Sequence, residues 1–261
     1  MTSIIQFADI HFGVEDKDAM AALASVVTDL QPDVTVICGD ITQNGKAQEF
    51  YAARDWIRTL SGPKIITPGN HDTPMFGILQ RVFDPFGRFN KIIGPLSEPY
   101  YADQHVTILP INTSRGWQLK LDWSLGVVDL DALERLAMNM QAIGSTTLNF
   151  VMAHHPFIYP SSSPLQKETQ NGPEALKRLS QLNIDAVLSG HVHVPFALER
   201  QLDATEIMSI GAGTLSERRR NKSASFNHIH VDADILRVTP IAWEQGRFNS
   251  LTPFTKKIAA Q

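Results

Sequence analysis

Residues 3–11 read Ser-Ile-Ile-Gln-Phe-Ala-Asp-Ile-His, and residues 33–40 read Asp-Val-Thr-Val-Ile-Cys-Gly-Asp. In each stretch a run of mostly apolar, often β-branched residues leads into an aspartate, a pattern typical of a buried strand that ends in a polar loop. Between them, residues 18–30 carry apolar side chains at helical spacing, and Gln31-Pro32-Asp33 predicts the end of that helix. The start of the chain therefore predicts a β-α-β unit, the building block of a parallel sheet.

Helix and strand alternate further along the chain. Three more segments have helical spacing and each precedes a strand-like run; the helices are predicted over 47–60, 129–141 and 171–182, and the strands over 64–67, 148–153 and 186–188. From 206 to 245 polar and apolar residues alternate, which predicts C-terminal antiparallel strands. We expect one α/β domain over 1–261, with two packed sheets flanked by helices.

Five short polar motifs follow the predicted strands and contain six of the nine histidines: Asp9-Ile10-His11, Gly39-Asp40, Gly69-Asn70-His71-Asp72, His154-His155-Pro156 and Gly190-His191-Val192-His193. Open α/β folds place their sites where such strand ends meet at one edge of the sheet. Imidazole nitrogen and carboxylate oxygen suit transition metals, and a two-metal site needs about six to eight such ligands. The motifs supply seven: Asp9, His11, Asp40, Asn70, His154, His191 and His193.

The spacing within the motifs gives a first idea of the geometry. Asp9 and His11 are two residues apart, so in an extended segment both side chains lie on the same side, and the same reasoning applies to His191 and His193. Gly39 removes a side chain where a metal ion or phosphate would approach closely. Asp40 is the natural bridge between two ions.

In this order the motifs D-x-H, G-D, G-N-H-D, H-H-P and G-H-x-H resemble the calcineurin-like metallophosphoesterase superfamily, and within it the bacterial class III cyclic nucleotide phosphodiesterases. The resemblance extends over about residues 3–214 and is specific because all five motifs occur in order. It implies a four-layer α/β/β/α sandwich with two mixed β-sheets and a dinuclear metal site at one edge. It also implies two ligand sets that share Asp40: Asp9, His11, Asp40 and His193 for one ion, and Asp40, Asn70, His154 and His191 for the other.

The resemblance also implies a cofactor and a reaction. The cofactors would be two divalent or trivalent transition-metal ions, with manganese, iron, zinc and cobalt all open. Two cations bridged by a water lower its pKa and orient the hydroxide for in-line attack on phosphorus. The family counterpart of His71 contacts the phosphate and stabilises or protonates the leaving oxygen, a role suited to an imidazole. Asp72 is expected to orient His71.

Other candidate substrate contacts are less sharply defined. Asn70, His71, His155 and Arg115 are the candidate substrate-binding residues; for His155, support of a neighbour, substrate contact and plain packing all stay open. Residues 217–222 form the only dense basic run, which is either a solvated hairpin tip or a clamp for an anionic substrate or phospholipid surface. Residues 73–105 are irregular and rich in phenylalanine, and we expect a cap insertion there.

Composition narrows the class of protein. The formal net charge of −4 argues against a surface built mainly for nucleic-acid backbone. The single cysteine, Cys38, cannot form an internal disulfide, which favours a reducing compartment. No signal peptide or stretch of membrane-spanning length is apparent. We expect a soluble, cytoplasmic protein, and leave peripheral membrane contact and a homodimer open.

These observations predict a metal-dependent phosphoric diester hydrolase acting on a small phosphodiester, with cyclic nucleotides as the first class to test. Another phosphoester of the same chemistry is the alternative: a glycerophosphodiester, a nucleotide-sugar lipid pyrophosphate, a phosphomonoester or nucleic acid. A scaffold that kept the fold but lost catalysis, and a binding module that uses the basic run, are the rivals of other classes.

Overall fold

The computed structural model describes residues 1–119, 122–144, 146–165, 167–202 and 205–258. Its strands are β1 (Thr2–Phe7), β2 (Val34–Cys38), β3 (Lys64–Thr67), β4 (Tyr101–Ala102), β5 (Val106–Pro110), β6 (Leu148–Met152), β7 (Ala186–Ser189), β8 (Phe196–Leu202), β9 (Thr205–Gly211), β10 (Ser225–Val231), β11 (Ile235–Glu244), β12 (Arg247–Ser250) and β13 (Phe254–Lys257). Its helices are α1 (Lys17–Leu30), α2 (Ala47–Ile57), α3 (Ile78–Phe83), α4 (Gly87–Ile92), α5 (Leu130–Ile143) and α6 (Gly172–Gln181), with short 3-10 turns η1 (Asn70–Asp72) and η2 (Gly94–Leu96).

The strands form two mixed sheets. The first has the order β12-β11-β10-β1-β2-β3, with β13 also paired to β11, and the second has the order β4-β5-β6-β7-β9-β8. In the first sheet β1, β2 and β3 are parallel, and in the second β5, β6 and β7 are parallel. All five motif-bearing strands therefore belong to the two parallel blocks, where neighbouring carboxyl ends lie at the same edge.

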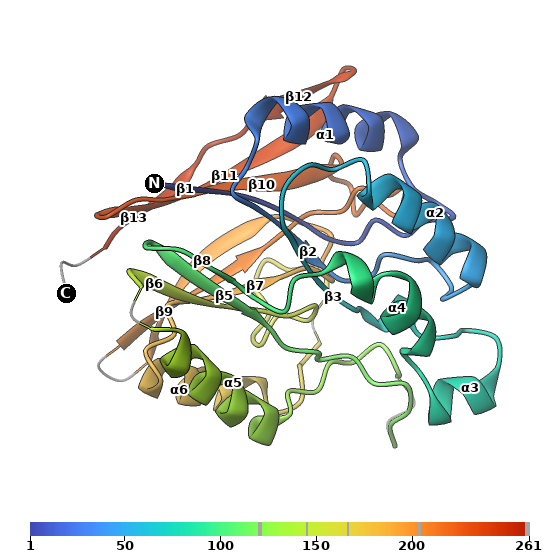
Figure 1. The fold of residues 1–261 in the computed structure, drawn as a ribbon, viewed down its shortest axis with the longest axis horizontal. Helices are drawn as coiled ribbons and strands as arrows, with labels where there is room; N and C mark the ends of the chain where they lie inside the picture. Colours follow the sequence, from blue (N-terminus) through green and yellow to red (C-terminus); the bar gives the residue numbers. More distant parts are fainter. Residues whose placement is uncertain (120–121, 145, 166, 203–204, 259–261) are drawn as a thin grey trace.

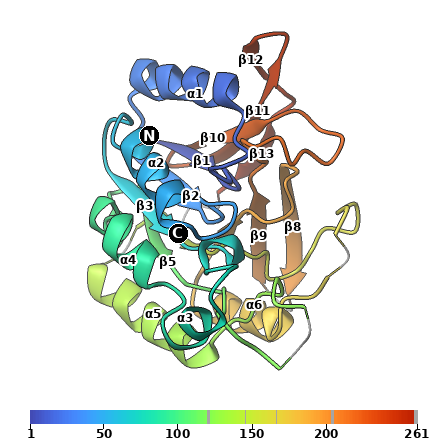
Figure 2. The same ribbon diagram turned by 90° about the vertical axis from the view of Figure 1, so that its right-hand side faces the viewer.

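Three separate apolar clusters show that these elements stack in four layers. One cluster joins the inner faces of the two sheets and contains Val36, Cys38 and Phe150. A second lies between the first sheet and helices α1, α2 and α4, and a third between the second sheet and helices α5 and α6. Figure 1 shows α1 and α2 above the sheets and α5 and α6 below them, and the turned view of Figure 2 keeps this order. The predicted α/β/β/α sandwich with two mixed sheets is confirmed.

The long helices begin where local chemistry favours a start. Asp16 precedes α1 and its side chain accepts a hydrogen bond from the backbone nitrogen of Ala19, and Asp129 caps α5 in the same way through Ala132. Proline lies in the first turn of α6, where its missing N–H removes no helical hydrogen bond. The four helices predicted over 18–30, 47–60, 129–141 and 171–182 correspond to α1, α2, α5 and α6.

Two segments have more structure than the sequence indicated. The irregular stretch after residue 73 contains α3 and α4; α4 contributes Phe89 and Ile92 to the cluster beneath α2, whereas α3 exposes Leu79 and Phe83. Beyond residue 205, β10 and β11 are antiparallel as expected, but β9 runs parallel to β7 while pairing with β8 in the antiparallel sense. None of the helices in the described ranges has the length and apolar composition needed to cross a bilayer.

Candidate metal centre

The five motifs begin where β1, β2, β3, β6 and β7 end. Five of the seven proposed ligands leave the strand in left-handed backbone conformation, with φ values of 54° for Asp9, 50° for His11, 51° for Asp40, 67° for His191 and 64° for His193. Asp and His tolerate this region better than most residues, although it still costs roughly 1–3 kcal/mol at each position. Such strain persists where the surroundings hold it, and it concentrates at functional sites.

This backbone corrects the reasoning from residue spacing. Asp9 and His11 are brought together by left-handed turns and not by the two-residue repeat of an extended strand, with His11 Nε2 3.9 Å from Asp9 Oδ1. His191 and His193 also have left-handed backbones, but their side chains turn apart, His193 toward Asp9 and His191 toward His154. The spacing therefore predicted the first pair of neighbours for the wrong geometric reason, and its prediction for the second pair is wrong.

Glycines let the motif loops approach one another. A Cβ on Gly39 would lie 2.7 Å from His154 Nδ1 and 2.8 Å from the Gly69 nitrogen, and one on Gly190 would lie 2.4 Å from Ala8 Cβ. A Cβ on Gly69 would lie 2.1 Å from Asp40 Oδ1. Gly39 was expected to make room for a metal ion or phosphate, but the structure fills that space with the backbone of the next loop and an imidazole.

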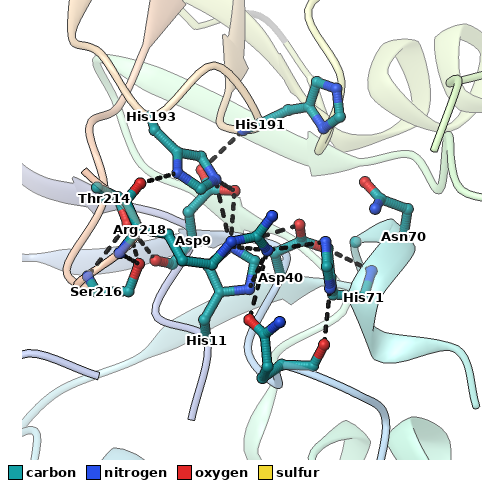
Figure 3. A network of polar contacts seen from close by, with 12 residues as sticks. Asp9, His11, Asp40, Asn70, His71, His191, His193, Thr214, Ser216 and Arg218 are labelled. Carbon is teal, nitrogen blue, oxygen red and sulfur yellow. Dashed lines mark hydrogen bonds and ion pairs between the residues drawn. The ribbon is translucent and has the colours of Figure 1, made fainter. Parts of the chain in front are cut away.

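One group of donors comes from the ends of β1 and β7 (Figure 3). His193 Nε2 lies 3.2 Å from Asp9 Oδ1 and 3.2 Å from His11 Nε2, and His11 Nε2 lies 3.8 Å from Asp40 Oδ2. All four side chains are buried. The second carboxylate oxygen of Asp9 accepts a hydrogen bond from the backbone nitrogen of His191, at 2.7 Å, which fixes its orientation.

A second group lies on the other side of Asp40. His154 Nε2 is 3.4 Å from Asp40 Oδ2, 3.1 Å from Asn70 Oδ1 and 3.3 Å from His191 Nδ1. Asp40 Oδ1 accepts a hydrogen bond from the backbone nitrogen of His71 at 2.8 Å, so Oδ2 is the oxygen that faces both groups. Asp40 thus lies between the two sets of donors.

The arrangement of lone pairs fits metal ions. His154 Nδ1 donates to the Cys38 carbonyl and His193 Nδ1 donates to the Arg218 carbonyl, both at 2.8 Å, so in the neutral rings each Nε2 presents a lone pair to the carboxylates. A histidine that binds metal usually donates its other N–H in this way. His191 Nε2 is also buried and has no hydrogen-bond partner among the described residues. Buried acceptors that face one another cost free energy unless a proton or cation lies between them, and this nitrogen and oxygen set suits transition metals.

The two carboxylates of the site are ionised. Burial alone would raise the pKa of Asp40, but the imidazoles of His154 and His71 lower it well below its ordinary value. Burial also opposes ionisation of Asp9, whose pKa is nevertheless lowered, chiefly by His193. Each residue therefore offers a charged oxygen for a cation.

The imidazoles differ in their protonation. Burial lowers the pKa of His11 to about 3 and lowers that of His191 well below its ordinary value, so both rings are neutral, as metal ligands must be. Burial also disfavours the charged form of His154, but the Asp40 carboxylate outweighs it and raises the pKa of His154 to about 9. Metal binding at His154 must therefore displace a proton.

His71 lies beside both groups and is fixed by two contacts (Figure 3). Its Nδ1 donates to the Gln43 carbonyl at 2.7 Å, and its Nε2 lies 2.9 Å from Nη1 of Arg218. Gln43 and Arg218 were not among the predicted site residues. The basic run that contains Arg218 was the only sequence signal for it, and nothing local to Gln43 indicates its contact.

The predicted contact between Asp72 and His71 is wrong. Asp72 Oδ2 accepts hydrogen bonds from the nitrogens of Ile41 and Gly69 at 3.1 and 2.9 Å, and Oδ1 accepts from the nitrogen and hydroxyl of Thr42 at 2.8 and 2.9 Å. The 3-10 turn at residues 70–72 directs this side chain back toward the start of its own loop and the loop after β2. Asp72 holds two motif loops together, while the Gln43 carbonyl orients His71.

Two other predicted substrate-binding residues have partners within the protein. His155 is fully buried, with Nδ1 2.9 Å from Thr113 Oγ1 and Nε2 3.0 Å from the Ser124 carbonyl, so neither ring nitrogen faces a substrate. Arg115 lies 3.7 Å from Asp129, the residue that caps α5. The geometry argues against substrate contact by His155 and joins Arg115 to the start of α5.

A cavity of about 170 Å³ opens beside the donor groups. Its lining includes Asn70, His71, Met75, Arg81 and Trp123, with the Arg81 guanidinium 5.1 Å from the Trp123 ring centroid. The Arg81 side chain is held by the Gly116 carbonyl at 2.8 Å. The cavity lining therefore combines polar groups, two of them candidate site residues, with aromatic and thioether surface.

Comparison with known proteins extends these findings. A sequence model of calcineurin-like phosphoesterases matches residues 2–195. A Synechococcus protein named a probable cyclic nucleotide phosphodiesterase is 28% identical over 252 residues, which cover 92% of each chain. The glycerophosphodiester phosphodiesterase GpdQ of Enterobacter lignolyticus is 32% identical over 80 residues, or 26% of this chain and 29% of that protein. A dimetal phosphatase from Danio rerio has the same fold, with a TM-score of 0.68 and 11% identity over 99% of both chains.

Proposed function

The chain belongs to the calcineurin-like phosphoesterase family, and from this premise we propose that it is a two-metal phosphodiesterase that hydrolyses a small phosphodiester such as a cyclic nucleotide. The observation that carries the proposal is the pair of buried nitrogen and oxygen groups on either side of Asp40, whose atoms lie close enough together for each group to hold an ion. The naming of a full-length relative as a probable cyclic nucleotide phosphodiesterase supports the substrate class.

In this proposal the chain holds two transition-metal ions through two donor sets. Asp9, His11 and His193 bind one, Asn70, His154 and His191 bind the other, and Asp40 bridges them. When bound, such ions lower the pKa of a coordinated water and offset negative charge on the phosphoryl oxygens. Manganese, iron, zinc and cobalt all suit these ligands.

His71 is proposed to act on the leaving oxygen. Because its Nδ1 donates to a carbonyl that can only accept, the ring is held in one tautomer and orientation, and Nε2 is the atom that gives or takes a proton. Asn70 presents its side-chain oxygen to His154, which leaves its amide nitrogen as the group able to donate to substrate. Both residues line the cavity.

The size and lining of the cavity favour a phosphodiester whose ester group is small. Its volume of about 170 Å³ and its mix of Met75, Trp123 and Arg81 suit a ring or a short polyol better than a polymer. Glycerophosphodiesters are the second candidate, favoured by the partial match to a glycerophosphodiester phosphodiesterase.

Turnover of defined esters tests the function. Manganese-loaded protein is assayed with bis(p-nitrophenyl) phosphate, p-nitrophenyl phosphate, 3′,5′- and 2′,3′-cyclic AMP and glycerophosphocholine, beside Asp40→Ala and His71→Ala. We expect diester cleavage that Asp40→Ala abolishes and His71→Ala lowers by about 100-fold in kcat, the usual scale for a general acid. Cleavage of the monoester alone would overturn the diesterase, and absence of turnover with every metal would support the scaffold.

A further inference from the structure

Arg218, in the basic run at residues 217–222, lies beside the histidines of the candidate site. Nη1 of Arg218 lies 2.9 Å from His71 Nε2, 3.4 Å from Gln43 Oε1 and 3.5 Å from both ring nitrogens of His11 (Figure 3). His71 and His11 follow strands of the first sheet, whereas Arg218 follows β9 at the far end of the sequence. The arginine therefore brings to His71 and His11 a cationic group that none of the five motifs supplies.

The backbone of Arg218 is part of the same assembly. Its nitrogen donates to Ser216 Oγ at 3.2 Å, and Ser216 Oγ contacts Thr214 Oγ1 at 2.7 Å, which donates to the Asp9 carbonyl at 2.6 Å. The Arg218 carbonyl accepts the Nδ1 proton of His193. Since both ends of this chain of contacts are proposed metal ligands, the backbone position of Arg218 is fixed by the site itself.

The neighbouring arginine points away. Arg219 pairs with Asp16, the residue that caps α1, and lies 3.6 Å from Glu217. Arg219 therefore lies on the outer surface of the loop between β9 and β10, and of these two arginines only Arg218 approaches His71. If the basic run attracted anions only through its overall charge, both arginines would contribute. A specific anion-binding site would depend on Arg218 alone of the two.

The charges around Arg218 favour binding of an anion. Asp9 and Asp40 supply two negative charges, against which two divalent cations would bring four positive ones, and Arg218 adds another. A guanidinium beside bound cations is repelled unless an anion lies between them, and its planar N–H groups match two phosphoryl oxygens. We propose that Arg218 is a phosphate-binding residue that donates to a non-bridging phosphoryl oxygen beside His71, an inference that rests on the proposed phosphodiesterase function.

Binding of inorganic phosphate tests this without turnover. Manganese-loaded wild type, Arg218→Gln, Arg218→Lys and Arg219→Gln are titrated with phosphate by calorimetry, after metal content is measured by mass spectrometry. We expect Arg218→Gln to weaken phosphate binding at least tenfold with full metal content, Arg218→Lys to restore part of the loss, and Arg219→Gln to stay within twofold. Kinetics with the best diester should show the same loss as a raised KM.

Three results would overturn the inference. Arg218→Gln could leave the phosphate affinity unchanged, Arg219→Gln could lower it equally, or the lower affinity of Arg218→Gln could be explained entirely by a lower metal content. The last would make Arg218 a structural support of His193. Wild-type protein that binds phosphate through Arg218 but cleaves no diester would refute the proposed function and leave this binding site intact.

Discussion

At the scale of single residues, the site depends on which groups can donate a hydrogen bond. His154 and His193 each use one ring N–H on a backbone carbonyl, and their other nitrogens then face carboxylates that have no proton to give. Asp72 is the opposite case, because every partner of its carboxylate is a donor. Two kinds of aspartate therefore coexist in the motif loops: Asp9 and Asp40 each turn one oxygen toward the imidazoles, whereas both oxygens of Asp72 accept from N–H and O–H donors.

Asp72→Asn tests the second kind. The amide nitrogen must replace one carboxylate oxygen, so at least one buried backbone N–H, from Thr42 or from Ile41 and Gly69, loses its acceptor. We expect the free energy of unfolding to fall by about 1–3 kcal/mol, the cost of an unsatisfied buried donor. Urea denaturation at neutral pH measures it, and Asp131→Asn, at an exposed position, should change stability by less than about 0.5 kcal/mol. Equal effects of the two variants would contradict the role given to Asp72.

Cys38 gives a second test at this scale. Its thiol is fully buried, burial raises its pKa, and Gln6 Nε2 lies 3.7 Å from the sulfur. Because only the thiolate reacts, we expect native protein to label with Ellman's reagent at least about 100-fold more slowly than protein in 6 M guanidinium. One equivalent should react after unfolding. Fast labelling of the native chain would mean that the interface between the sheets opens readily.

At the scale of elements, periodicity and end signals predicted the four long helices and the strands that carry the motifs. They succeed because an amphipathic helix and a buried strand are local patterns of ten or so residues. The short helices α3 and α4 were missed, since six residues hold too few periods to show. The parallel pairing of β9 with β7 was missed as well, because the sequence of a strand does not show which other strand it pairs with.

In the candidate site, too, local features could be predicted from the sequence, whereas contacts between distant loops could not. Side-chain identity and motif order pointed to the seven proposed ligands, because metal chemistry selects residue types. The left-handed turns, the Gln43 carbonyl and the approach of Arg218 arise from contacts between loops distant in sequence. Asp72 was misjudged for the same reason, since a neighbour in sequence is not a neighbour in space.

The start of α5 offers a test of an element. Asp129 Oδ1 accepts from the Ala132 nitrogen at 3.0 Å, and Asp129 also lies near Arg115. We expect Asp129→Ala to lower stability by about 1 kcal/mol through loss of the cap, and Asp129→Asn to retain most of it, because Asn caps equally well. Thermal and urea unfolding measure both. If Asn is as harmful as Ala, the charge pair with Arg115 matters more than the cap.

At the scale of the whole molecule, the donors join two sheets that otherwise meet through apolar side chains and through the buried amides of Gln6 and Asn227, which donate to carbonyls of the second sheet. Asp9, His11, Asp40 and Asn70 follow strands of the first sheet, and His154, His191 and His193 follow strands of the second. A ligand held between them binds the folded chain and not the unfolded one, so it must stabilise the fold. This coupling separates a true metal centre from a cluster of packed polar residues.

Metal loading should therefore raise the melting temperature. Free metal at about 100 times its Kd adds about 2.7 kcal/mol per site, and about 2–4 °C per kcal/mol is usual for a domain of this size; each ion should thus contribute about 5–10 °C, reversed by EDTA. Because Asp40 lies between both donor groups, Asp40→Ala should abolish most of the shift, whereas His193→Ala should retain one ion. Native mass spectrometry counts the ions and calorimetry measures the shift. If Asp40→Ala retained two ions, or if both variants lost the same number of ions, Asp40 would not be a bridging ligand. Loss of a ligand shared by two ions should remove both ions, whereas loss of a ligand to one ion should remove only that ion.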